Sequence, residues 1–190
     1  DNHCAYCVIP SLRGKFRSRA MEDVLKEAQA LADAGVRELI IVAQDITRYG
    51  MDLYHEHKLS ELLHELCKMD FTWVRLHYLY PDEITDDMIE TIAQEPKIVK
   101  YLDIPIQHAS DAVLRRMGRK TDREHLEKMI RTLREEIPDI CLRTTLITGF
   151  PGETEEDFET LLDFVDEMEF DRLGVFPYSQ EEDTPAALME

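Results

Sequence analysis

Cys4 and Cys7 have the C-x-x-C spacing, which brings two thiols to one centre. This spacing is typical of zinc sites, iron-sulfur clusters and thiol-disulfide exchange. A closed zinc site needs four ligands, but the sequence has no second such pair and no histidines at a convincing spacing. A thioredoxin-like pair begins a helix, whereas VIPSLRGKFRSR separates these cysteines from the first helical pattern. Zinc and redox exchange are therefore disfavoured, but the motif alone leaves all three chemistries open.

The composition indicates a soluble globular protein. The 190 residues are 44% hydrophobic and 33% charged, with no apolar run long enough to span a membrane and no visible secretory signal. We therefore expect a cytoplasmic protein without a membrane partner. Four cysteines are too few for a disulfide scaffold, and we expect Cys67 and Cys141 to be small buried apolar residues.

The charge is strongly acidic and unevenly distributed. The net charge of -18 argues against a general nucleic-acid-binding surface, which needs clustered Lys and Arg. Residues 151–190 contain 14 acidic residues against one arginine, a net charge of -13. This distribution predicts a solvated acidic face, and it would also suit a basic protein partner.

Helical patterns alternate with short β-branched runs along the chain. Apolar spacing predicts helices over 18–34, 59–69, 86–95, 123–137 and 155–168, and strands beginning near Val36, Thr72, Tyr101, Cys141 and Arg172. We expect Ser18 to cap the first helix, and Thr154 with Asp157 to form a capping box at the last. The alternation predicts an α/β fold with a parallel sheet, either open or closed into a barrel.

Polar residues follow each of the predicted strands. In parallel α/β folds, ligands bind at the carboxyl ends of the strands, which is where these residues lie. These residues are Gln44 and Asp45; His77, Tyr78 and Tyr80; Gln107 and His108; Thr148 and Gly149; and Tyr178 and Ser179. Each could be a cap or turn residue, but their convergence on one edge favours a pocket.

Segments along nearly the whole chain resemble the radical S-adenosylmethionine (SAM) methylthiotransferases. The segments are CAYCVIPSLRGKFRSR, IIVAQDITRYG, LDIPIQHAS, TTLITGFPGETEEDF and YSQEEDTPAA. Three of the sequence segments, DNHCAYCVIP, LDIPIQHAS and SQEEDTPAA, are most similar to the RimO family. Enzymes of this family methylthiolate an aspartate of small-subunit ribosomal protein twelve.

The resemblance implies the architecture of the whole protein. It implies a partial TIM-type (β/α)6 barrel, with residues 1–190 forming a catalytic core that lacks its first strand. It also implies an N-terminal methylthiotransferase domain with a second 4Fe-4S cluster, and a C-terminal TRAM domain, both outside this chain. Such a core is not expected to be fully active alone.

The resemblance also implies cofactors and site residues. The family motif C-x-x-x-C-x-x-C makes Cys4 and Cys7 ligands of a 4Fe-4S cluster, with the third cysteine expected just before Asp1. Three thiolates leave one iron open for SAM. Candidate SAM-binding residues are Tyr6 at the adenine, Gln44 and Asp45 at the amino group, and Gln107, Arg143 and Gly149 at the ribose or carboxylate. Each of two candidates also has a purely structural alternative: Tyr6 could pack against its neighbours, and Arg143 could form an ion pair. The catalytic residues stay unknown, and Glu153 is assigned no direct role.

The sequence supports three hypotheses about function. The first is methylthiolation of the ribosomal protein, which requires that protein and an electron-donor protein as partners. The second is methylthiolation of tRNA adenosine by an enzyme of the MiaB type. The third is a non-catalytic interaction domain stabilised by a metal.

Overall fold

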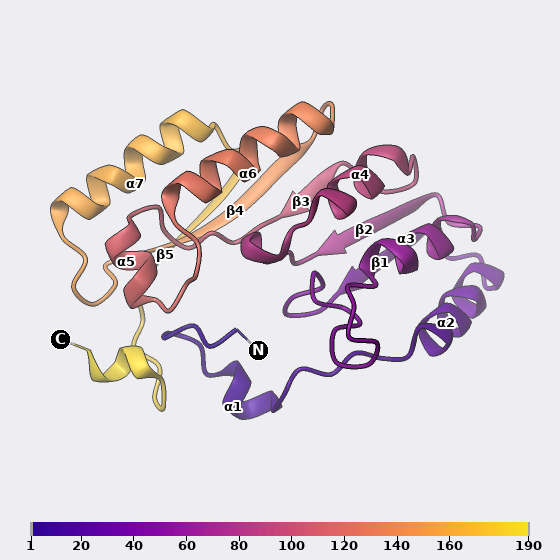
Figure 1. The fold of residues 1–190 in the computed structure, drawn as a ribbon, viewed down its shortest axis with the longest axis horizontal. Coiled ribbons are helices and arrows are strands. Elements are labelled where there is room, and N and C mark those ends of the chain that lie inside the picture. The colour runs from indigo at the N-terminus through magenta and orange to yellow at the C-terminus, as the bar shows by residue number, and fades with distance from the viewer. Residues whose placement is uncertain (1, 190) are drawn as a thin grey trace. The chain divides into compact units, whose positions relative to one another are not determined.

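The computed structural model describes residues 2–189, in which helices and strands alternate (Figure 1). The strands are β1 (Glu38–Val42), β2 (Trp73–His77), β3 (Tyr101–Asp103), β4 (Cys141–Thr148) and β5 (Arg172–Pro177). The helices are α1 (Ile9–Arg13), α2 (Met21–Asp33), α3 (Leu59–Cys67), α4 (Asp86–Gln94), α5 (Asp111–Arg116), α6 (Arg123–Glu136) and α7 (Glu155–Met168), with the 3-10 turns η1 (Pro81–Glu83) and η2 (Pro185–Leu188).

The chain divides into two compact units. The first unit contains the residues up to Phe16, Pro105–Arg131 and the residues from Arg143 onward. The second unit contains Arg17–Ile104 and Thr132–Leu142. The strand β4 begins in the second unit and continues into the first.

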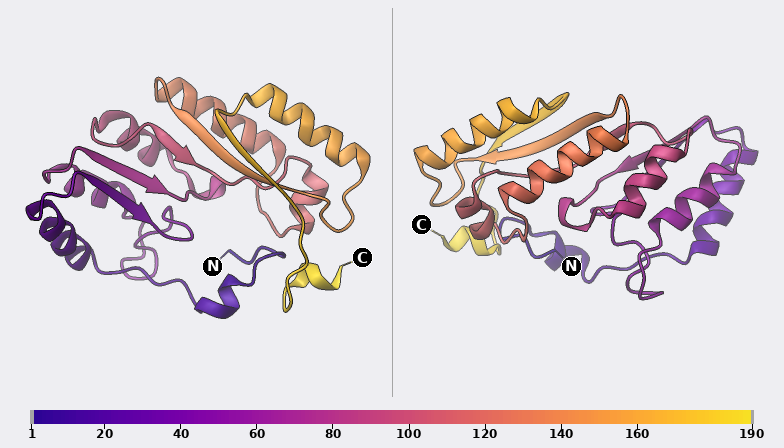
Figure 2. Two further views of the ribbon diagram at one scale, coloured as in Figure 1. Left: turned by 180° about the vertical axis from the view of Figure 1, so that it is seen from behind. Right: turned by 45° about the horizontal axis from the view of Figure 1, so that its top comes forward.

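In the second unit, β1 and β2 are parallel neighbours. Their register runs from Glu38 opposite Trp73 to Val42 opposite His77. The helices α2, α3 and α4 lie on one face of these strands, as both views show (Figure 2). Burial alternates along β2, as expected for a strand with one face in the core. Val74 and Leu76 are fully buried, whereas the residues between and beside them are exposed or partly buried.

In the first unit, β4 and β5 are parallel, and α7 lies on one face of them (Figure 2). Their register runs from Arg143 opposite Arg172 to Thr148 opposite Pro177. Alternate β4 residues such as Thr144 and Leu146 are buried, while Arg143, Thr145 and Ile147 are only partly buried. The latter three side chains therefore share the open face of the strand.

The structure confirms the α/β class, the parallel strands and the positions of the predicted strands. It also confirms the capping box of α7, formed by Thr154 and Asp157. Cys67 is buried as expected, but the expectation that Cys141 is buried is wrong, because Cys141 lies on the partly buried face of β4. No helix within the described residues is both long and apolar enough to cross a bilayer.

The expected Ser18 cap is wrong. The helix α2 begins at Met21 and has no side-chain cap. The Ser18 hydroxyl instead accepts a hydrogen bond from the Gly50 amide at 3.0 Å, and the Ser18 amide donates to the Asp52 carboxylate at 2.8 Å. The Ser18 hydroxyl is therefore hydrogen-bonded to the loop that contains Gly50 and Asp52, and it does not cap the helix.

Removal of the Thr154 hydroxyl should lower the free energy of unfolding by about 1 kcal/mol, because Thr154→Ala leaves the Asp157 amide without its capping partner. Urea unfolding measures the effect. The matched control is Thr160→Ala on the same helix, whose hydroxyl donates to the Glu156 carbonyl and caps nothing. Its free energy should change by less than about 0.5 kcal/mol. Equal losses in the two variants would contradict the capping assignment.

The effect of Thr154→Ala should also depend on pH. Hydrogen bonds from the Ser110 hydroxyl, the Thr154 amide and the Thr154 hydroxyl lower the pKa of Asp157 below its ordinary value, and Thr154→Ala removes the last of these. A carboxylate with a lowered pKa stabilises the fold at neutral pH, and this contribution is lost as the pH falls through that pKa. Urea unfolding should therefore show a smaller difference between Thr154→Ala and the parent in acid than at pH 7.

Candidate functional site

Cys4 and Cys7 lie on one tight turn in the first unit. The Cys7 amide donates to the Cys4 carbonyl at 3.1 Å, which closes the turn between the two thiols. Cys4 is buried, and Cys7 is partly buried. Burial raises the pKa of the Cys7 thiol, a hydrogen bond from the Ile9 backbone lowers it, and the neighbouring Cys4 thiol raises it. Metal binding would displace the thiol protons, since thiolates are the binding form.

The two cysteines provide part of a metal site. Within residues 2–189, no group of three or more His, Cys, Asp or Glu side chains could hold a metal ion. Soft thiolates are the ligands that iron-sulfur clusters take, so the donor chemistry of Cys4 and Cys7 fits such a cluster as two of its ligands. The expected third cysteine lies outside the described residues.

Two segments from elsewhere in the first unit hold the turn through its backbone. The Ala5 amide donates to the Met117 carbonyl at 2.7 Å, at the C-terminal end of α5. The Ala5 carbonyl accepts a hydrogen bond from the Ala186 amide in η2 at 2.9 Å. Ala5 lies between the two cysteines, so both hydrogen bonds act directly on the segment that carries the thiols.

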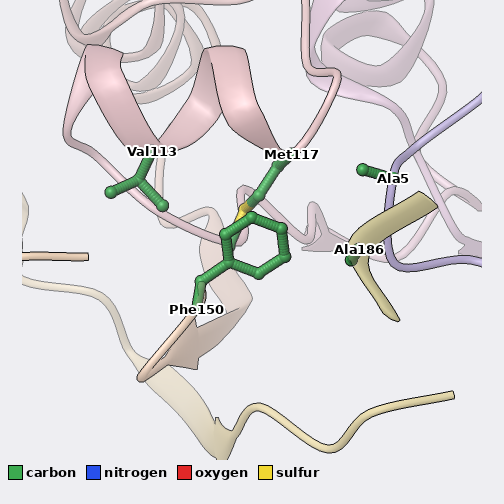
Figure 3. Packing of buried hydrophobic residues seen from close by; sticks show 5 residues of the cluster. All are labelled: Ala5, Val113, Met117, Phe150 and Ala186. Atoms are coloured by element: carbon green, nitrogen blue, oxygen red, sulfur yellow. The ribbon is translucent and has the colours of Figure 1, made fainter. Parts of the chain in front are cut away.

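An apolar cluster supports the same turn (Figure 3). Its buried residues, shown as sticks, are Ala5, Val113, Met117, Phe150 and Ala186. The Phe150 ring occupies the centre of the view, with Met117 pointing toward it. The Tyr6 ring meets the Phe150 ring edge-on, with centroids 6.4 Å apart. Tyr6 therefore packs in the structure, and its predicted role at the adenine stays a prediction.

The loop after β4 adjoins this cluster. Gly149 precedes Phe150 and has a φ of 70°, which favours glycine. An added Cβ would have no neighbour within 4 Å, so the backbone here borders open space. A ligand could approach the main chain at this position without a steric obstacle.

Gln107 adopts an unusual backbone conformation beside β4. Its φ is 73°, a left-handed value that costs a non-glycine residue about 1–3 kcal/mol. Its amide donates to the Thr145 carbonyl at 2.9 Å, and its carbonyl accepts from the Ile147 amide at 2.8 Å. These bonds hold Gln107 as a one-residue extension of the sheet after β3. Such strained positions are concentrated at functional sites, which supports Gln107 as a site candidate.

The remaining candidates lie in different units. Arg143 is in the first unit on the open face of β4, where its guanidinium donates to the Thr145 hydroxyl at 3.4 Å. Gln44 and Asp45 lie in the second unit, after β1. Gln44 is exposed, and the Asp45 carboxylate accepts hydrogen bonds from the amide and hydroxyl of Thr47. Asp45 thus shapes its own loop, and the SAM-binding roles of both residues stay predictions.

Sequence reasoning missed the segments that hold the cysteine turn. The helix α5 has six residues, too few to show a helical apolar period. The anchoring groups of Met117 and Ala186 are backbone atoms, which leave no signature in residue type. Sequence reasoning also assigned Glu153 no direct role, although its side chain contacts His108 in the structure.

The sequence matches known families along most of its length. Residues 1–165 match the model of the radical SAM superfamily. Two proteins named ribosomal protein uS12 methylthiotransferase RimO are similar over all of this chain. The relative from Alkaliphilus oremlandii is 56% identical, with 44% of its length covered, and that from Geobacter sulfurreducens is 60% identical, with 42% covered. The chain therefore spans less than half the length of these relatives.

Solved structures share the fold. The radical SAM methyltransferase TsrM from Kitasatospora setae superimposes with a TM-score of 0.79 at 19% identity, covering 98% of this chain and 36% of TsrM. The radical SAM enzyme HemN from Escherichia coli gives a TM-score of 0.63 at 23% identity, covering 93% of this chain and 41% of HemN. These matches support the predicted partial TIM-type barrel, and the family model and curated relatives confirm the resemblance stated from sequence. The chain belongs to the radical SAM superfamily, whose chemistry depends on a 4Fe-4S cluster and SAM.

Proposed function

We propose that this chain is the core of a methylthiotransferase that modifies an aspartate side chain of ribosomal protein uS12. The observation that carries the proposal is the identity of 56–60% across the whole chain with relatives named for that activity. The net charge of -13 over residues 151–190 is compatible with a basic protein substrate, but it is weak support, because the proposed TRAM domain would also take part in recognising the substrate.

The residues around the cysteine turn suit the proposed cofactors. Cys4 and Cys7 would bind the cluster, together with a third cysteine just before Asp1. When bound, the cluster supplies the electron for reductive cleavage of SAM. We infer that Tyr6, Gln107, Arg143 and Gly149 contact SAM, and Gln44 and Asp45 are the further SAM-binding candidates that the family resemblance implies. The open space at Gly149 and the fixed backbone of Gln107 support this assignment.

We assign the rest of the reaction to parts of the protein beyond residues 1–190. The relatives are more than twice as long as the matched region, which leaves room for an N-terminal methylthiotransferase domain and a TRAM domain. The N-terminal domain would carry a second 4Fe-4S cluster implicated in sulfur delivery. An electron-donor protein would be a further partner, and a ribosomal substrate would place the reaction in the cytoplasm.

Gly118 keeps the cysteine turn close to the end of α5. Its φ is 72°, and an added Cβ would lie 3.0 Å from the His3 carbonyl oxygen and 3.8 Å from the Cys4 Cα. Backbone atoms cannot move away as a flexible side chain would. A methyl group at this position would therefore push the turn away from α5, in addition to straining its own backbone.

Gly118→Ala in the full-length protein should accelerate loss of cluster iron to a chelator by roughly tenfold, a loss typical of perturbed support around metal ligands. The matched control is Gly35→Ala, which has a similar φ of 83° but no atom within 4 Å of the added Cβ. Both variants should lose about 1 kcal/mol of stability from backbone strain. Equal iron loss in both would show that the contact with the turn is unimportant.

Cys4→Ser and Cys7→Ser should each reduce deoxyadenosine formation from SAM by about 100-fold or more, since each removes a proposed ligand of the cluster. The assay uses the anaerobically reconstituted full-length protein with a reductant. The control is Cys67→Ser, because Cys67 lies in α3 of the second unit. Full SAM cleavage by both cysteine variants would contradict the cluster assignment. A parent that binds zinc tightly and never cleaves SAM would indicate a non-catalytic metal-stabilised domain.

The substrate is tested by mass spectrometry. Full-length protein incubated anaerobically with SAM and reductant should add a methylthio group to an aspartate of uS12. The same reaction is offered tRNA as the competing substrate. Added mass on tRNA alone would replace this proposal with a MiaB-type activity.

A further inference from the structure

His108 is a fully buried histidine directly after Gln107. Its exposed fraction is 0%, and its Nδ1 accepts a hydrogen bond from the Ser110 amide at 3.0 Å. Burial lowers the pKa of His108, although Glu153 acts in the opposite direction. A neutral imidazole whose Nδ1 accepts a hydrogen bond has its proton on Nε2. The Nε2 proton therefore faces the neighbouring side chain of Glu153.

Glu153 bridges from that imidazole to the loop after β4. One carboxylate oxygen, Oε1, lies 3.5 Å from the His108 Nε2, and the other, Oε2, accepts a hydrogen bond from the Phe150 amide at 2.9 Å. Only 5% of the Glu153 side chain is exposed. The separation of 3.5 Å is long for a hydrogen bond, and an approach of about 0.5 Å would give an ordinary one.

The two side chains connect the loops that carry two proposed cofactor residues. His108 is covalently next to Gln107, whose backbone is fixed between Thr145 and Ile147. Glu153 fixes the amide of Phe150, which is covalently next to Gly149. The contact between His108 and Glu153 therefore adds a side-chain connection between the segment of Gln107 and the loop of Gly149, beyond the backbone hydrogen bonds that join Gln107 to β4.

A second link joins the same loops nearby. The Ser110 hydroxyl donates to the Asp157 carboxylate at 2.5 Å, at the start of α7. This link already ties the loop after β3 to the N-terminus of the helix. The His108–Glu153 contact lies nearer than this link to Gln107 and Gly149 along both loops, so its loss should affect those two positions more.

We propose that His108 and Glu153 are positioning residues that hold the loops of Gln107 and Gly149 at the spacing required to bind SAM. This inference rests on the proposed function. Neither side chain needs to touch SAM, since both are buried and act on residues next to them in sequence. Their loss should weaken SAM binding more than it slows the cleavage of bound SAM.

The test uses full-length protein with reconstituted clusters and the variants His108→Phe, Glu153→Gln and the double variant. Electron paramagnetic resonance of the reduced cluster, titrated with SAM, gives the half-saturating SAM concentration, and deoxyadenosine formation gives KM and kcat. Each single variant should raise the half-saturating concentration and KM by about tenfold, with kcat within about twofold. The double variant should be no worse than either single one, because contacting residues are coupled. His108→Gln, which keeps a donor and an acceptor, should restore part of the affinity.

A second histidine–glutamate pair provides the matched control. His64 on α3 lies 2.7 Å from Glu95, and both residues belong to the second unit. His64→Phe and Glu95→Gln should leave the half-saturating SAM concentration unchanged. Iron content and thermal unfolding of every variant show whether it is folded. If His108→Phe does not fold, Glu153→Gln and His108→Gln carry the comparison.

The outcomes separate the two proposals. An active parent whose folded His108 and Glu153 variants bind SAM like the parent would overturn the positioning role alone. The same holds if kcat and cluster content fall while SAM affinity is unchanged, because the pair would then serve only the fold. A parent with intact clusters that never cleaves SAM would overturn the proposed function, and this inference with it.

Discussion

The backbone of Ala5 is the point on which the arrangement of the cysteine turn depends. Its amide donates a hydrogen bond to the end of α5, and its carbonyl accepts one from η2. The small side chain lets both segments approach, and the apolar cluster around Phe150 excludes water from these hydrogen bonds. Main-chain contacts therefore limit how far the two thiols can move relative to each other.

The same cluster connects the turn to the ends of the strands. Phe150 packs against Tyr6 and Tyr178, and its amide is held by Glu153. Glu153 in turn reaches His108, which follows the strained backbone of Gln107. The first unit thus places the turn, the loop after β3 and the loop after β4 in one connected set of contacts. Strain at Gln107 is tolerated because hydrogen bonds to β4 on both sides of the residue compensate for it.

Local patterns predicted most of the regular structure. Strands such as β2 and β4 were evident because their apolar residues recur with the period of a strand or form a continuous run. The capping box at Thr154 was also predictable, since its partner lies within one helical turn. The Ser18 cap failed because a distant loop provided alternative hydrogen bonds, and α5 was missed because it is too short for a period to show.

The sequence by itself determined the cysteine pair, the alternation of helices and strands, and the resemblance to the radical SAM methylthiotransferases. These features depend on residue type and spacing along the chain, and both can be read without coordinates. Only the tertiary structure decided that Ala186 and Met117 hold Ala5, and that Glu153 contacts His108. These contacts join residues from separate segments, and several of them use backbone atoms that every residue type possesses, so no local pattern encodes them.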